Sequence, residues 1–160
     1  MRILVVGTGG VGSAFAAIAQ RREAFELVVL ADLDESRPRA LCERLGEPDR
    51  FVARRIDASD RDEIVELIGE VRPDAVLNAT DPRFVPPIFD ACLQARATYL
   101  DMAMSLSEPH PTRPYEETGI KLGDYQLERD AAWREAGLLA LVGIGVEPGA
   151  ADVFARHAAD

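Results

Sequence analysis

The sequence has few positive charges for its size. Among its 160 residues, Lys and Arg number 18 against 28 Asp and Glu, so the net charge is −10. The basic residues also form no run, whereas a protein that neutralises phosphate groups needs a basic face. We therefore expect neither nucleic acid nor an anionic membrane surface as a partner.

Cysteine and long apolar runs are scarce as well. The two cysteines, Cys42 and Cys92, have no Cys-x-x-Cys spacing and no neighbouring histidine. We therefore expect the reduced thiols of a cytoplasmic protein, with neither a disulfide framework nor a metal site. No apolar run is long enough to cross a bilayer. The run ILVVG, which follows Met1 and Arg2, is too short for the core of a signal peptide, so no leader is expected.

What the chain does contain is a regular alternation of apolar runs and helical patterns. Six runs are predicted to be strands: RILVV (2–6), ELVVLAD (26–32), RFVARRID (50–57), DAVLNAT (74–80), ATYLDMA (97–103) and LLALVGIG (138–145). Several lack polar alternation, as expected of strands covered on both faces. The segments between them, at 10–23, 35–47, 59–71, 83–96 and 123–137, have helical spacing or capping signals. This order predicts an α/β fold with a doubly wound parallel sheet of about six strands in three layers, the Rossmann fold.

The length is that of one domain, which we place at residues 1–148. Residues 102–123 interrupt the alternation with three prolines and two glycines. A loop that long in a compact domain is usually functional or directed toward a partner. Residues 149–160 are expected to begin a further helix after the turn GVEPG, with Pro148 at its first position.

A glycine-rich motif follows the first predicted strand and opens the first predicted helix. Its six residues are Gly7, Thr8, Gly9, Gly10, Val11 and Gly12. The spacing G-x-G-x-x-G in this context is typical of dinucleotide binding. Gly7 would permit the tight turn, Gly9 would let the backbone approach a pyrophosphate, and Gly12 would let the helix pack closely on the strand. The pyrophosphate would lie on free amide groups at the helix N-terminus.

Asp32 ends the second predicted strand, 20 residues after Gly12 (32 − 12). This is the position of a carboxylate that accepts hydrogen bonds from the adenosine ribose, and we include the adjacent Leu33 in the same contact. A carboxylate here repels a 2′-phosphate, which favours NAD over NADP.

Two observations leave alternatives open at this strand end. Asp32 could instead stabilise the turn after the strand or cap the following helix. Asp34 and Ser36, which follow it, are also residues that cap helices. Arg37 and Arg39 could accept a 2′-phosphate, so NADP is not excluded.

Two further strand ends should border the same crevice, because ligands bind outside the carboxyl ends of parallel strands. Asp57 and Ala58 follow the third predicted strand and would meet the adenine, although Asp57 could equally cap the next helix. Asn78, Ala79 and Thr80 close the fourth predicted strand and would lie along the pyrophosphate and the nicotinamide ribose.

Catalytic residues are not identified by the sequence. Asp101 ends the fifth predicted strand near the expected nicotinamide, but a structural role in the following loop explains it as well. His110 and Lys121 lie in the irregular segment. Both could take part in catalysis or substrate binding, but both could also be exposed surface residues without such a role. Cys92 could be the nucleophile of an aldehyde-type dehydrogenase, but it lies in a helical segment without a histidine.

Several motifs in order resemble a known family. ILVVGTGGVG, VVLAD, DAVLNAT with its following proline, ATYLDMA and GIGVEPGAADVFA resemble the dinucleotide-binding portion of the saccharopine dehydrogenase superfamily, which includes lysine 6-dehydrogenase-like and carboxynorspermidine dehydrogenase-like enzymes. The first motif is common to all Rossmann proteins, whereas the combination is more selective. The irregular segment resembles the lysine dehydrogenase-like branch.

The resemblance implies an NAD(P)-dependent oxidoreductase acting on a carbon–nitrogen bond of an amino acid or polyamine derivative. It also implies that the helix after GVEPG leads into a second domain, which builds most of the substrate pocket and often a homodimer interface. The chain would then bind the dinucleotide without turning over substrate on its own.

A regulatory NAD-sensing domain of the ion-channel type is the alternative from another class. Such domains share the glycine motif, the acid after the second strand and a stretch like DASD (57–60). VLNATDP, the irregular segment and GIGVEPG favour the enzyme, because a sensor has no need of them.

Overall fold

A computed structural model describes all 160 residues of the chain. The strands are β1 (Arg2–Val6), β2 (Leu27–Asp32), β3 (Phe51–Arg55), β4 (Ala75–Asn78), β5 (Thr98–Asp101) and β6 (Ala140–Leu141). The helices are α1 (Gly10–Ala19), α2 (Ser36–Leu45), α3 (Arg61–Val71), the 3-10 turn η1 (Pro82–Phe84), α4 (Val85–Ala95), α5 (Asp124–Leu127), α6 (Asp130–Glu135) and α7 (Ala150–Ala159). No helix combines the length and the apolar composition that crossing a membrane requires.

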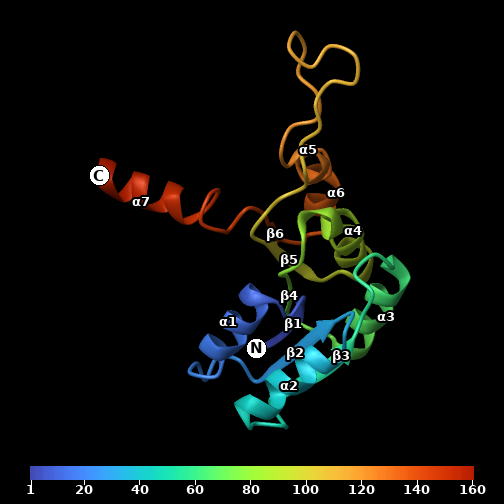
Figure 1. Cartoon of the computed structure of the whole chain (residues 1–160), viewed down its shortest axis with the longest axis vertical. Helices are drawn as coiled ribbons and strands as arrows, with labels where there is room; N and C mark the ends of the chain where they lie inside the picture. The colour runs from blue at the N-terminus through green and yellow to red at the C-terminus, as the bar shows by residue number, and fades with distance from the viewer.

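The six strands form one parallel sheet in the order β3-β2-β1-β4-β5-β6. This order reverses between β1 and β4, and such a reversal opens a crevice at the carboxyl ends of the strands. The predicted doubly wound Rossmann fold is therefore confirmed. The arginine-rich third strand forms as predicted, and it lies at one edge of the sheet (Figure 1).

Apolar side chains on both sides of the sheet explain its three layers. In β1, Leu4 and Val6 belong to a core with α3, α4 and Trp133 of α6, whereas Ile3 and Val5 belong to a second core with α1 and α2. Successive strand residues point to opposite faces. A strand buried on both faces therefore needs an unbroken apolar run, as RILVV provides.

The sixth strand is shorter than the sequence predicts. It spans two residues, because Gly143 turns the chain away with φ +69° and donates its amide to Asp101 Oδ1 at 2.8 Å. The adjacent Ile144 amide donates to the Asp101 carbonyl at 2.9 Å. The side chain and backbone of one residue in β5 therefore end the pairing of β6.

Two helix boundaries also differ from expectation. The segment 123–137 forms α5 and α6 and not one helix, because the Arg129 amide bonds to the Gln126 carbonyl, three residues back, which tightens the turn between them. Pro148 is not the first residue of α7. It precedes the N-cap residue Gly149, whose amide donates to Asp152 at 3.0 Å.

The irregular segment 102–123 and helix α7 both extend away from the layered body (Figure 1). The segment contains no helix or strand, and its one β-bridge joins Glu108 to Ile120 in antiparallel orientation. Helix α7 has no buried residue, and its Val153 and Phe154 are 68% and 71% exposed.

Candidate dinucleotide site

The glycine loop joins β1 to α1 at the crevice, and two of its glycines are required by the protein itself. Gly7 has φ +97°, and a Cβ there would lie 2.7 Å from the Ala79 carbonyl oxygen. A Cβ on Gly12 would lie 2.0 Å from the Gly7 carbonyl oxygen, so any side chain would separate α1 from the loop. Gly7 thus allows the tight turn, and Gly12 allows the close packing of the helix, that the motif predicts.

Gly9 and Gly10, in contrast, are not required by the packing or the backbone conformation of the protein itself. A Cβ on Gly9 or Gly10 would meet no atom within 4 Å, and neither residue has a positive φ. The amides of Gly9, Gly10, Val11 and Gly12 donate to no acceptor in the chain, and no side chain caps α1. This loop therefore presents a row of N–H groups without an acceptor in the chain, with open space beside Gly9 and Gly10, and such an arrangement binds phosphate oxygens.

Asp32 lies beside this loop and contacts it directly. Its Oδ2 accepts hydrogen bonds from the Thr8 amide at 2.8 Å and the Thr8 hydroxyl at 2.9 Å, and its Oδ1 accepts from the Asp34 amide at 3.2 Å. Burial acts to raise the pKa of Asp32, but these hydrogen bonds and the nearby Arg37 outweigh it, so the pKa lies below its usual value. The carboxylate is therefore charged at neutral pH, and Oδ1 retains capacity for a further donor.

A cavity of about 150 Å³ lies where the predicted adenosine contacts meet. Its lining residues are Val6, Gly7, Asp32, Leu33, Ile56, Asp57, Ala58, Thr80 and Phe84. Six of these are predicted contact residues from four separate strand ends. The prediction misses Val6, Ile56 and Phe84. For the last two, the apolar residue after β3 and the first aromatic residue after β4 were available as signals.

The structure does not make Asp57 a helix cap. Asp60 caps α3 by accepting hydrogen bonds from the Asp62 and Glu63 amides. Asp57 instead accepts from the Ser59 hydroxyl at 2.6 Å and the Ser59 amide at 2.9 Å, and these two bonds lower its pKa. Its side chain therefore holds the turn that borders the cavity.

The residues after β4 divide into a buried and a crevice-facing part. Asn78 is buried, where its Oδ1 accepts hydrogen bonds from the Thr80 amide and hydroxyl and its Nδ2 donates to the Tyr99 hydroxyl at 3.1 Å. The side chain of Asn78 is thus directed into the protein. Thr80 lines the cavity, and the Ala79 carbonyl lies against Gly7.

None of the catalytic candidates Asp101, His110, Lys121 and Cys92 lines this cavity. Asp101 is 1% exposed and bonds within the protein. His110 lies in the irregular segment, where its Nδ1 accepts from the Arg113 amide and its Nε2 lies 3.2 Å from Glu117. Lys121 is exposed in the same segment, and its amide donates to Asp124.

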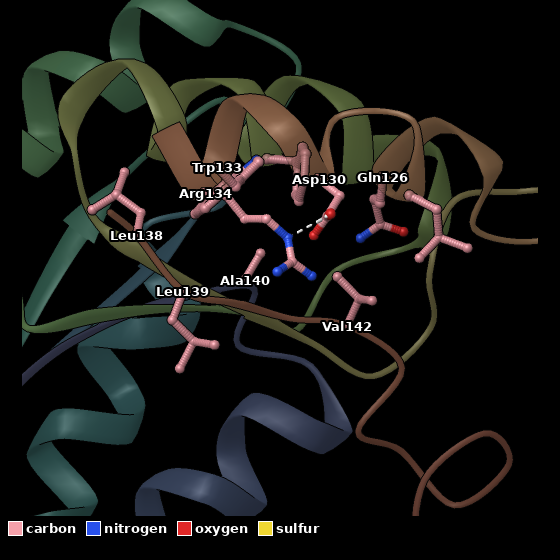
Figure 2. Close-up of a pocket in the computed structure, with 10 residues that line it drawn as sticks. Gln126, Asp130, Trp133, Arg134, Leu138, Leu139, Ala140 and Val142 are labelled. Atoms are coloured by element: carbon pink, nitrogen blue, oxygen red, sulfur yellow. Dashed lines mark hydrogen bonds and ion pairs between the residues drawn. The ribbon is translucent and has the colours of Figure 1, made fainter. Parts of the chain in front are cut away.

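A second cavity, of about 240 Å³, lies at the β6 edge of the sheet and not at the glycine loop. Figure 2 shows Trp133, Asp130 and Arg134 of α6 facing the segment that contains Ala140 and Val142, with Arg134 paired to Asp130. None of the predicted cofactor residues contributes to this cavity.

The sheet order, the crevice and the free amides define the class of a Rossmann dinucleotide-binding domain. Residues 3–141 match the family model described as the saccharopine dehydrogenase NADP binding domain. The chain belongs to this family, and the assignment favours the NAD(P)-binding domain of an oxidoreductase over the regulatory alternative.

Curated relatives agree with the family match. The chain is 33% identical over 171 residues to a carboxynorspermidine synthase of Vibrio cholerae, covering 99% of this chain and 39% of that protein. It is 29% identical to a carboxyaminopropylagmatine dehydrogenase of Synechocystis sp., covering 98% of this chain and 37% of that protein. The chain therefore spans less than half the length of these relatives.

Solved structures show the same fold. Apo saccharopine dehydrogenase (L-Glu forming) from Saccharomyces cerevisiae superposes with a TM-score of 0.73 at 17% identity, covering 96% of this chain and 29% of that one. An NAD binding oxidoreductase from Klebsiella pneumoniae superposes with a TM-score of 0.62 at 20% identity, covering 89% of this chain and 34% of that one.

Proposed function

We propose that this chain binds NAD(H) across the glycine loop and supplies the cofactor half of an oxidoreductase acting on a carbon–nitrogen bond. The four amides of residues 9–12, which have no acceptor in the chain, carry the proposal, together with the open space beside Gly9 and Gly10. They would hold the pyrophosphate, while Asp32, Leu33, Asp57 and Ala58 would surround the adenosine and Ala79 and Thr80 would face the nicotinamide half. When bound, the nicotinamide would accept or donate the hydride.

The preference for NAD over NADP depends on charge at the end of β2. Asp32 is a charged carboxylate at the expected ribose position, and it would repel a 2′-phosphate. The two arginines that could attract that phosphate have other partners: Arg39 pairs with Glu35 at 2.8 Å, and Arg37 lies 3.7 Å from Asp34. Titration calorimetry with NADH and NADPH tests this proposal, and we expect the tighter binding with NADH. Tighter binding of NADPH would refute the role of Asp32.

The substrate is proposed at the level of chemical class. The names of the curated relatives, carboxynorspermidine synthase and carboxyaminopropylagmatine dehydrogenase, favour a carboxylated polyamine or agmatine derivative over lysine itself. We expect a nucleotide-bound but catalytically silent domain, because no titratable side chain other than Asp32 and Asp57 lines the crevice cavity.

A second domain following α7 fits the exposed apolar surface. A groove of about 460 Å³ on the α1 side of the sheet is lined only by apolar residues: Ile3, Val11, Ala14, Phe15, Ile18, Leu77, Leu100, Met102 and Ile144. An exposed groove lined only by apolar residues is a surface that a second domain or a partner can cover. We expect residues 149–160 to lead into a substrate and dimerisation domain that covers this groove, and isolated chains to form homodimers through it at high concentration.

A cytoplasmic location is proposed from the cysteines. Cys92 is buried with the core of α3 and α4, whereas Cys42 packs against the core of α1 and α2 on the opposite face of the sheet. Two thiols on opposite faces cannot pair with each other, so the fold uses no internal disulfide.

A further inference from the structure

A buried hydrogen-bonded network connects the dinucleotide crevice to the irregular segment. It begins at Thr80, which donates to Asn78, and continues from Asn78 Nδ2 to the Tyr99 hydroxyl at 3.1 Å. The Tyr99 hydroxyl donates to Asp101 Oδ2 at 2.8 Å. On the far side, Gln126 Nε2 donates to the same oxygen at 2.6 Å.

Asp101 is the centre of this network. Its Oδ1 accepts from the Gly143 amide at 2.8 Å and the Met104 amide at 3.4 Å, so each carboxyl oxygen has two donors. None of the four donors is a charged side chain. A buried carboxyl group whose acceptor positions are all used tolerates little displacement of any single donor, because a lost bond is not replaced by water.

The network reaches beyond the elements that hold the cofactor. Gln126 Oε1 accepts the Ser105 amide at 2.8 Å, and this bond fixes the base of the irregular segment to α5. Gly143 lies at the exit of β6, in the segment that continues to α7. Burial and the neighbouring Asp101 raise the pKa of Tyr99, so its phenol remains protonated and keeps donating.

We propose that Tyr99 and Asp101 are positioning residues that couple the dinucleotide crevice to the base of the irregular segment and to the chain leaving β6. The inference rests on the proposed function, because the ligand acts on the network through Thr80 at the crevice wall. Neither residue lines the cavity, so they act through their hydrogen-bonded neighbours, which include Asn78, Gln126 and Gly143.

Hydrogen exchange on the full 160-residue chain, with and without NADH, tests the coupling. We expect NADH to raise the protection of the Ser105 and Gly143 amides by about fivefold or more, although neither residue lines the cavity beside Asp32. Tyr99→Phe keeps the ring and removes both hydroxyl bonds, and it should abolish this rise while NADH still binds. Tyr125→Phe is the matched control, because its hydroxyl bonds to Asp90, outside the network, and the rise should persist.

If NADH binds without changing the protection of these two amides, or if Tyr99→Phe keeps the change, the coupling is refuted and the proposed function stands. If calorimetry shows no NADH binding, both proposals are refuted. Should Tyr99→Phe fail to fold, Thr80→Val removes the hydroxyl bond to Asn78 at the partly exposed end of the network, and Thr80→Ser keeps it. Both variants are compared at saturating NADH, because Thr80 also lies in the proposed binding site. Equal protection changes in these two variants would also refute the coupling.

Discussion

Asp32 accepts two hydrogen bonds from Thr8, one from the amide at 2.8 Å and one from the hydroxyl at 2.9 Å. The acid at the end of β2 therefore fixes the middle of the glycine loop, and it does so through Oδ2. Oδ1 accepts only the Asp34 amide and stays available to a ribose hydroxyl. One carboxylate thus shapes the loop that would hold the pyrophosphate and also lines the cavity proposed for the adenosine.

Replacing Asp32 with Ala should weaken NADH binding by about 1–3 kcal/mol, the cost of losing charge-assisted hydrogen bonds. The preference for NADH over NADPH should shrink as well, because the repulsion of the 2′-phosphate is lost. Calorimetry with both nucleotides measures the two effects. Asp34→Ala is the control, since Asp34 is exposed and bonds to Ser36, and an equal loss in that variant would contradict the assignment.

Two glycine substitutions should separate folding from binding. Gly12→Ala should destabilise the chain by about 3 kcal/mol or more, since its Cβ would overlap the Gly7 carbonyl oxygen. Gly9→Ala places its methyl group in open space, so the free energy of unfolding should change by no more than about 1 kcal/mol. NADH affinity should nevertheless fall about tenfold, or 1.4 kcal/mol, because the methyl group lies where the pyrophosphate would approach. Unchanged affinity in Gly9→Ala would contradict the site.

Acid should destabilise the chain partly through Asp32. Its pKa is lower in the folded chain than the unfolded value of about 3.9, so the stabilisation is complete above that value and is lost as pH falls through the folded pKa. Urea unfolding at a series of pH values from about 6 to 2 measures how the free energy of unfolding changes with pH. In Asp32→Asn this free energy should change less with pH than in the original chain. If the mutant and the original chain lose stability in parallel, the hydrogen bonds from Thr8 contribute nothing to it.

Cys92 should be inert in the folded chain. It is fully buried, and burial raises the pKa of its thiol far above neutral pH, so the nucleophilic thiolate does not form. A thiol reagent should therefore modify Cys92 only after denaturation, and peptide mapping identifies which cysteine reacts. Rapid modification of Cys92 in the native chain would revive the aldehyde-type alternative.

Most of the fold could be predicted from the sequence because local patterns specify it. The strands buried on both faces are unbroken apolar runs, and RILVV and DAVLNAT place β1 and β4 within one or two residues of their observed bounds. The glycine motif and Asp32 occur at fixed spacings, which bring them to the same crevice once the sheet order is known.

What the sequence could not reveal depends on contacts between distant residues. β6 ends early because Asp101, about forty residues upstream, captures the Gly143 amide. The network from Thr80 to Ser105 uses Gln126, which shows no local signal because its partners lie 21 and 25 residues away. Asn78 occupies the predicted strand end, but its side chain faces the core, a choice set by Tyr99 on the neighbouring strand.

The most direct test of the central claim is an amide NMR titration of the isotopically labelled chain with NADH. Free N–H groups that bind a pyrophosphate gain charge-assisted hydrogen bonds, which shift their amide resonances strongly. We predict that the largest saturable shifts fall on Gly9, Gly10, Val11 and Gly12, with smaller shifts at Asp32 and Leu33. Saturable shifts elsewhere, with residues 9–12 unmoved, would contradict the account.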